Sequence, residues 1–96
     1  MTLQAMNEDA YHIIVTGRVQ GVGFRYYTKK KADKLFLKGW VQNLGDGSVE
    51  IFVEGAVEGI NAFIEWCHYG PSSAEVKKLD YSKSNPEEFT DFLIRR

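Results

Sequence analysis

The sequence predicts one α+β sandwich, in which two helices cover one face of an antiparallel sheet. Three observations support this prediction. The chain has 96 residues, which is enough for one compact domain with one modest core. Short runs rich in β-branched and aromatic residues alternate with two longer segments of helical spacing. Clusters of Gly, Asp and Pro separate these segments where the chain has to turn.

The first nine residues are mostly polar and show no periodicity. We therefore expect residues 1–9 to form a flexible tail and residues 10–96 to form the single domain. Residues 10–16 are rich in β-branched and aromatic side chains and end at a glycine, which predicts the first strand. His12 alternates with its neighbours, and we interpret it as a strand residue rather than a catalytic one.

Residues 24–37 have the spacing of an amphipathic helix. The predicted buried stripe consists of Phe24, Tyr27, Thr28, Ala32 and Leu35. Lys31 also falls in this stripe, where its stem can lie along apolar surface while the ammonium reaches water. We expect Gly39 to stop the helix or to follow its last turn.

Residues 40–44 and 49–54 predict two strands of a hairpin, with Asp46-Gly47 as the turn signal. Apolar and acidic residues partly alternate in residues 49–54, so we expect one face of that strand to contact water. Gly55 should break this strand.

Residues 57–69 predict the second helix, with an apolar stripe of Ile60, Phe63, Ile64 and Cys67. Residues 76–82 predict a fourth strand, and residues 92–94 predict a last short strand that joins the sheet. This order gives a ferredoxin-like βαββαβ sandwich with an extra strand at the end.

Composition excludes several classes of function. The formal net charge is −1, so no basic excess favours nucleic acid, and the lysines at 29–31 and 34 are interpreted as a solvated helix face. No apolar run is long enough to span a bilayer, and no signal peptide is evident. The single cysteine fits the cytoplasm, where we expect the protein to act as a monomer. Cys67 and His68 are adjacent on a helix and make a poor metal pair.

The segment 17–25, Gly-Arg-Val-Gln-Gly-Val-Gly-Phe-Arg, lies between the first strand and the first helix. Its glycines allow a tight turn whose N–H groups, with the helix dipole, form a site for an anion. Arg25 at the helix start can grip a phosphate or carboxylate through two parallel hydrogen bonds. The competing interpretation is a purely structural turn, because the segment lacks the dinucleotide-binding and P-loop signatures.

Residues 17–25, together with Gly-Trp-Val-Gln-Asn at 39–43, resemble the acylphosphatase family. The second match continues through Asp46-Gly47, Val49-Glu50 and Gly55, and a weaker one begins at Gly70-Pro71. The resemblance covers about residues 11–96. It implies that Arg25 binds the substrate phosphate together with the loop amides of Gln20, Gly21, Val22, Gly23, Phe24 and Arg25. It also implies that Asn43 positions the attacking water. At Gly23 relatives carry either glycine or a bulky residue, and Gln42 is often basic in relatives.

The residues agree with the implied hydrolysis of the carboxyl–phosphate bond of acyl phosphates. A carboxylate leaving group, whose conjugate acid has a pKa of roughly 4, needs no general acid at neutral pH. Phosphoryl transfer chiefly requires positioning and charge stabilisation. No cluster of metal ligands is evident, so we expect metal-independent hydrolysis without a cofactor. Taken alone, Asn43 is better explained as a turn residue, whereas together with the loop and Arg25 it is better explained as a site residue.

Two other functions fit the same fold. One is a regulatory or RNA-binding module, although an RNA reader would need exposed aromatics and a basic surface. The other is an acylphosphatase-like domain of a larger carbamoyl-phosphate-using enzyme. We expect a free-standing enzyme that acts on small acyl phosphates and binds neither nucleic acid nor membrane.

Overall fold

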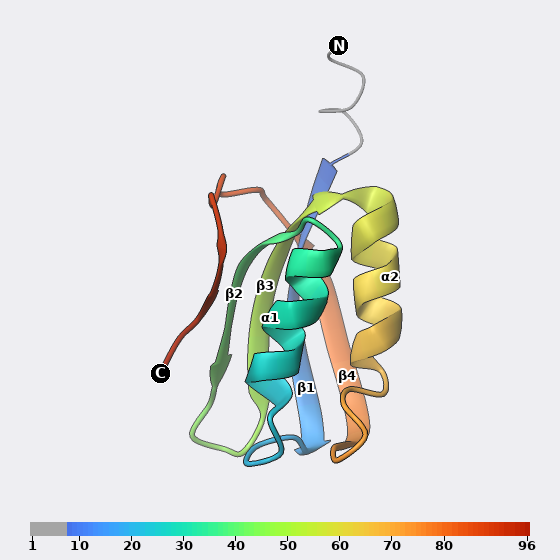
Figure 1. The fold of residues 1–96 in the computed structure, drawn as a ribbon, viewed down its shortest axis with the longest axis vertical. Coiled ribbons are helices and arrows are strands. Elements are labelled where there is room, and N and C mark those ends of the chain that lie inside the picture. The colour runs from blue at the N-terminus through green and yellow to red at the C-terminus, as the bar shows by residue number, and fades with distance from the viewer. Residues whose placement is uncertain (1–7) are drawn as a thin grey trace.

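The computed structural model describes residues 8–96, which fold into one five-stranded sheet and two helices (Figure 1). The elements in chain order are β1 (Glu8–Arg18), α1 (Phe24–Lys34), β2 (Lys38–Asn43), β3 (Val49–Ala56), α2 (Val57–Cys67), β4 (Glu75–Ser84) and β5 (Phe92–Ile94). The predicted α+β order is confirmed, and both helices lie on the same face of the sheet. The predicted tail lies largely outside the described residues, but Glu8 and Asp9 already belong to β1.

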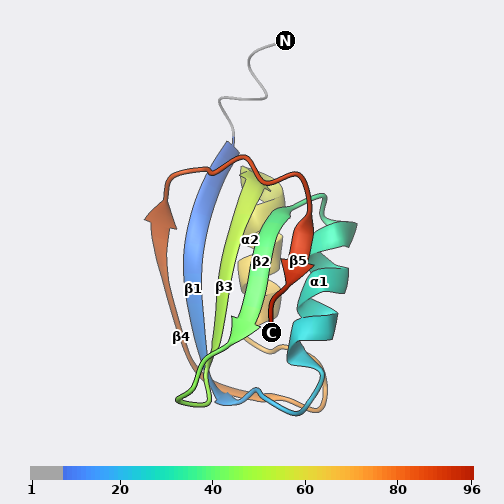
Figure 2. The ribbon, with the colours of Figure 1, turned by 90° about the vertical axis from the view of Figure 1, so that its left-hand side faces the viewer.

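The sheet is mixed rather than purely antiparallel. Its strand order is β4-β1-β3-β2-β5, and the first three pairings in this order are antiparallel. β5 pairs with β2 in parallel, with Trp40 opposite Leu93. Figure 2 shows the reason: the chain leaves β4 at one edge, passes over the end of the sheet and enters β5 from that same end. β5 therefore runs opposite to β4 and in the direction of β2.

The connection from β4 to β5 covers part of β3, which corrects the expectation of a wet face. Glu54 is 6% exposed, and its carboxylate accepts hydrogen bonds from the backbone N–H groups of Glu87, Glu88 and Phe89. The Phe89 ring packs against Phe52, with ring centroids 5.7 Å apart. The acidic side chain that suggested exposure instead anchors the connection.

The helix α1 ends earlier than the apolar spacing predicted. Phe24, Thr28 and Ala32 are buried as expected, but the helix stops at Lys34. Phe36 then adopts a left-handed conformation with φ 61° and is 84% exposed. Gly39 does not stop the helix: it lies inside β2, where an added Cβ would be 1.9 Å from the Phe52 carbonyl oxygen. Close strand packing, not a helix end, requires glycine there.

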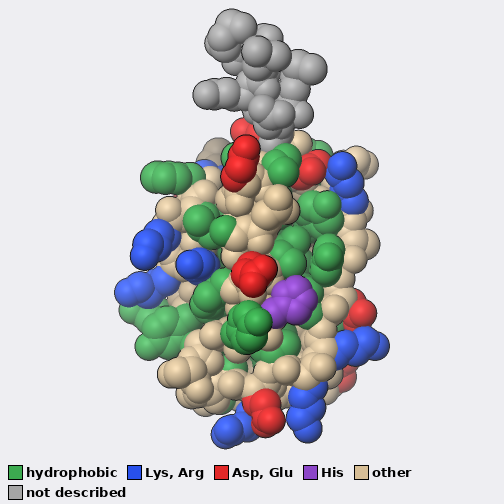
Figure 3. All heavy atoms as spheres, turned by 90° about the vertical axis from the view of Figure 1, so that its right-hand side faces the viewer, with side chains coloured by type: hydrophobic (Ala, Val, Ile, Leu, Met, Phe, Trp, Pro, Cys, Tyr) green, Lys and Arg blue, Asp and Glu red, His purple; other side chains and the backbone are tan. Residues whose placement is uncertain are grey.

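The helix α2 buries the stripe that its periodicity predicted, namely Ile60, Phe63, Ile64 and Cys67. It ends at Cys67, two residues before the expected end. Basic side chains gather on the α1 side of the helical face (Figure 3). Neither helix of the described part is long and apolar enough to cross a membrane.

Candidate functional site

The turn between β1 and α1 exposes a row of backbone N–H groups. Gly21 and Gly23 have φ values of 75° and 78°, so both lie in the left-handed region that favours glycine. Gly23 is the N-cap of α1, and no side chain caps the helix. Within residues 8–96, no hydrogen-bond acceptor is found for the N–H groups from Gly21 to Tyr26. These donors lie at the positive end of the helix dipole, where a bound anion would be stabilised.

The side chain of Gln20 fixes this turn to the β2–β3 hairpin. Its amide nitrogen donates hydrogen bonds to the carbonyl oxygens of Leu44 and Ser48, each at 2.8 Å. Both acceptors follow closely after Asn43 in the chain. Gln20 therefore sets the position of the turn relative to the residue at the end of β2.

Arg25 is held from the opposite side by the C-terminal segment. Its guanidinium donates a hydrogen bond to the Arg95 carbonyl oxygen at 3.1 Å. Arg95 in turn donates its N–H to the Val41 carbonyl oxygen at 2.8 Å, which extends the pairing of β5 with β2. No carboxylate of the described chain forms an ion pair with Arg25. Its positive charge is therefore oriented and available to an anion.

A cavity of about 270 Å³ brings these segments together. Its lining consists of Val19, Gly21, Gly23, Phe24, Arg25, Tyr26, Asn43, Ile94 and Arg96. Arg25 and Asn43, which the sequence analysis selected, line the same cavity although 18 positions separate them in the chain. Asn43 reaches it because it shares a sheet face with the buried Val41, two positions earlier.

Two of the selected loop residues have side chains outside this cavity. Gln20 points to the hairpin, as described above. Val22 packs against the hydrophobic core, and its carbonyl oxygen accepts a hydrogen bond from Ser73 Oγ at 2.8 Å. Phe24 is 1% exposed, so any contact that it makes with an anion comes from its N–H group.

Sequence reasoning missed four lining residues: Val19, Tyr26, Ile94 and Arg96. Val19 lies within the segment 17–25, and Tyr26 directly follows Arg25. Their closeness to Arg25 in the sequence could have identified them as candidate lining residues. The alternation of Phe92 and Ile94 predicted a strand but not its partner. Only the parallel pairing with β2 shows that the C-terminus reaches the site.

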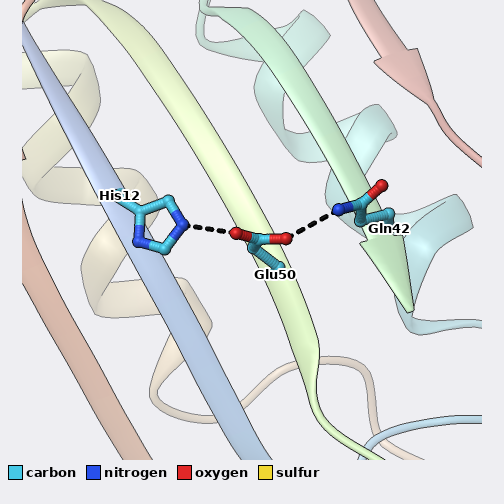
Figure 4. Close-up of polar contacts among 3 residues, drawn as sticks. All are labelled: His12, Gln42 and Glu50. Atoms are coloured by element: carbon cyan, nitrogen blue, oxygen red, sulfur yellow. Dashed lines mark hydrogen bonds and ion pairs between the residues drawn. The ribbon is translucent and has the colours of Figure 1, made fainter. Parts of the chain in front are cut away.

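On the sheet face opposite the helices, three side chains form a row of hydrogen bonds that we call the polar chain: His12, Glu50 and Gln42 (Figure 4). Glu50 accepts hydrogen bonds from His12 and Gln42, both at 2.6 Å. Burial raises the pKa of Glu50, but these hydrogen bonds and the charges of His12 and Arg95 outweigh it and place the pKa below 4.5. Because Gln42 and Asn43 are adjacent in a strand, this chain points away from the cavity.

The cavity combines three chemical elements: a row of N–H donors, one oriented guanidinium, and one side-chain amide. The donors and the guanidinium suit an oxyanion with several equivalent oxygens. Within residues 8–96, no hydrogen bond is found for the Asn43 side chain, so its amide can orient a bound water.

Comparison with known proteins identifies similar chains. Residues 11–94 match the acylphosphatase family model. An acylphosphatase from Trichormus variabilis is 47% identical over 85 residues, which cover 88% of this chain and 84% of the relative. The solved acylphosphatase from Coxiella burnetii is 40% identical and has a TM-score of 0.94, with coverage of 99% of this chain and 100% of the other. HypF of T. kodakarensis contains a similar portion, at 39% identity and a TM-score of 0.81, covering 92% of this chain and 12% of HypF.

Proposed function

The chain belongs to the acylphosphatase family, and from this premise we propose that it hydrolyses acyl phosphates at the cavity between the glycine-rich turn and Asn43. The products are a carboxylate and inorganic phosphate. The observation that supports this assignment most strongly is that Arg25 and Asn43 line one cavity together with the unpaired N–H groups of the turn.

In this proposal the turn and Arg25 bind the phosphate of the substrate. The N–H groups of Gln20 to Arg25 surround the phosphate oxygens, and the guanidinium forms charge-assisted hydrogen bonds to them. In the transition state the charge on the equatorial oxygens is redistributed, and fixed donors stabilise it without reorganisation. The bond from Arg25 to the Arg95 carbonyl keeps the guanidinium in place before substrate arrives.

Asn43 positions the nucleophile. Its side-chain oxygen accepts a hydrogen bond from the water, so that a lone pair of the water points at phosphorus. The P–O bond to the acyl group breaks while the new P–O bond forms, and the carboxylate leaves without protonation. Among residues 8–96, no Asp, Glu or His side chain lines the cavity, and we propose that a phosphate oxygen takes the proton of the water.

The test is hydrolysis of benzoyl phosphate in the presence of a chelator. We expect Arg25→Ala and Asn43→Ala each to lower kcat/KM by about 10²-fold or more, because each removes a transition-state contact. The matched controls are Arg18→Ala and Gln42→Ala, whose side chains do not line the cavity. Both controls should retain activity within about threefold.

Loss of activity in the chelator with wild-type protein would contradict metal independence. Equal losses in Asn43→Ala and Gln42→Ala would contradict the site assignment. Circular dichroism and urea unfolding of each variant separate a catalytic defect from a folding defect.

A further inference from the structure

A second groove lies on the helical side of the molecule, between α1, the end of α2 and the loop at 71–73. We call it the lysine groove, and its main lining residues are Tyr27, Lys30, Lys31, Lys34, Trp66 and Ser73. Its volume is about 360 Å³, which lies within the range of small-molecule sites. The basic side chains over α1 in Figure 3 border it.

The three lysines give the groove a local positive charge, and no acidic side chain among the described residues lies in its lining. No carboxylate of residues 8–96 forms an ion pair with Lys30, Lys31 or Lys34. Lys29, one position earlier, differs: it pairs with Asp33 at 3.1 Å and donates to the Phe92 carbonyl oxygen. No acidic residue lines the groove, although the whole chain has a net charge of −1. The cations are therefore concentrated where a cavity can hold an anion.

Aromatic side chains form the other part of the lining. Trp66 is half-buried and held by two core rings, with centroids 5.7 Å from Phe24 and 6.4 Å from Phe63. Tyr27 is 46% exposed and contacts the Tyr26 ring edge to face. A fixed indole and an accessible phenol ring provide surfaces on which a planar ring can stack.

We propose that the lysine groove binds a nucleotide, with its phosphates on the lysine ammonium groups and its base against Trp66 or Tyr27. Inorganic phosphate alone would leave the aromatic surface unused. An apolar ligand would leave Lys31 and Lys34 without an anionic partner, and Lys30 with only its contact to the Tyr26 ring, whose centroid lies 5.7 Å from Nζ. A nucleoside triphosphate carries both a planar ring and a chain of negative charges.

The groove is distinct from the cavity at Arg25. The two share no lining residue. They are neighbours through the loop at 71–73, because Ser73 Oγ donates to the carbonyl oxygen of Val22 in the glycine-rich turn. Because the two share no lining residue, binding in the groove can be tested apart from the proposed hydrolysis.

The experiment is calorimetric titration of the full-length protein with ATP in a chelator, with tripolyphosphate and adenosine as partial ligands. The double variant Lys30→Ala/Lys34→Ala should raise the Kd for ATP at least about tenfold, because two phosphate contacts are lost. The control Lys77→Ala/Lys78→Ala removes the same charge from β4 and should change the Kd less than about twofold. In a Trp40→Phe background, the remaining Trp66 fluorescence should change with the same Kd.

Three further results decide the proposal. Arg25→Ala should keep ATP binding; if it abolishes binding, ATP occupies the catalytic cavity and the proposal is wrong. Equal weakening by both lysine double variants shows only non-specific charge attraction and overturns it as well. Tripolyphosphate should bind several-fold more weakly than ATP, and equal affinity contradicts the stacking surface. The Lys30→Ala/Lys34→Ala variant should hydrolyse benzoyl phosphate at the wild-type rate. If the nucleotide proposal fails, the proposed hydrolysis is therefore unaffected.

Discussion

At the scale of single residues, the cavity depends on side chains that hold backbone segments together. Gln20 joins the glycine-rich turn to the hairpin, and Arg25 joins the start of α1 to the C-terminal segment. Sequence reasoning selected Gln20 only for its N–H group, because its position in the turn indicated nothing about its side-chain partners. The two acceptors are carbonyl oxygens 24 and 28 positions away.

Replacement of Gln20 by Ala tests this positioning role. The variant loses two hydrogen bonds, and we expect the free energy of unfolding to fall by about 1–2 kcal/mol. We also expect kcat/KM for benzoyl phosphate to fall about tenfold, because the turn is no longer fixed relative to Asn43. Urea unfolding and steady-state kinetics measure the two effects. Stability lost with unchanged kcat/KM would show that Gln20 only stabilises the fold.

At the scale of elements, periodicity identified both helices and all five strands, whereas their ends depended on tertiary contacts. The α2 stripe from Ile60 to Cys67 was correct because helical spacing alone determines which side chains share a face. Gly39 was assigned to a helix end because the sequence does not show that the Phe52 carbonyl lies against it. Glu54 predicted a strand face exposed to water, because the backbone N–H groups that its carboxylate binds lie more than 30 positions later in the sequence.

The polar chain across β1, β3 and β2 predicts how stability depends on pH. The folded pKa of Glu50 lies below its ordinary value of 4.5, so the unfolded state binds more protons as the pH falls. The stabilisation by Glu50 is fully present above that ordinary value and is lost as the pH falls through the folded pKa. We expect Glu50→Gln to lose less stability than wild type between pH 6 and pH 3, as measured by urea unfolding.

A matched control for this prediction is Glu65→Gln on α2, whose carboxylate forms no ion pair within residues 8–96. Its pH profile should follow that of wild type. If Glu50→Gln also follows wild type down to pH 3, the hydrogen bonds to His12 and Gln42 do not stabilise the carboxylate.

At the scale of the whole molecule, the site is assembled from three regions that only the fold brings together. The sequence could predict the turn at 17–25 as an anion site, since its glycines and Arg25 are contiguous. The role expected for Asn43 required the resemblance, because an asparagine at a strand end also fits a turn. The contribution of Ile94 and Arg96 could not be predicted, because the crossing of β5 to the far edge of the sheet is a property of the topology.

The central claim is a division of roles, in which Arg25 binds the phosphate and Asn43 positions the water. The most direct test is the inhibition constant of inorganic phosphate, measured alongside kcat for wild type, Arg25→Ala and Asn43→Ala. The account predicts that Arg25→Ala weakens phosphate inhibition about 30-fold or more, because a charge-assisted contact is lost. It predicts that Asn43→Ala leaves this constant within about threefold while kcat falls about 10²-fold. Near-normal phosphate inhibition in Arg25→Ala, or near-normal kcat in Asn43→Ala, would contradict it.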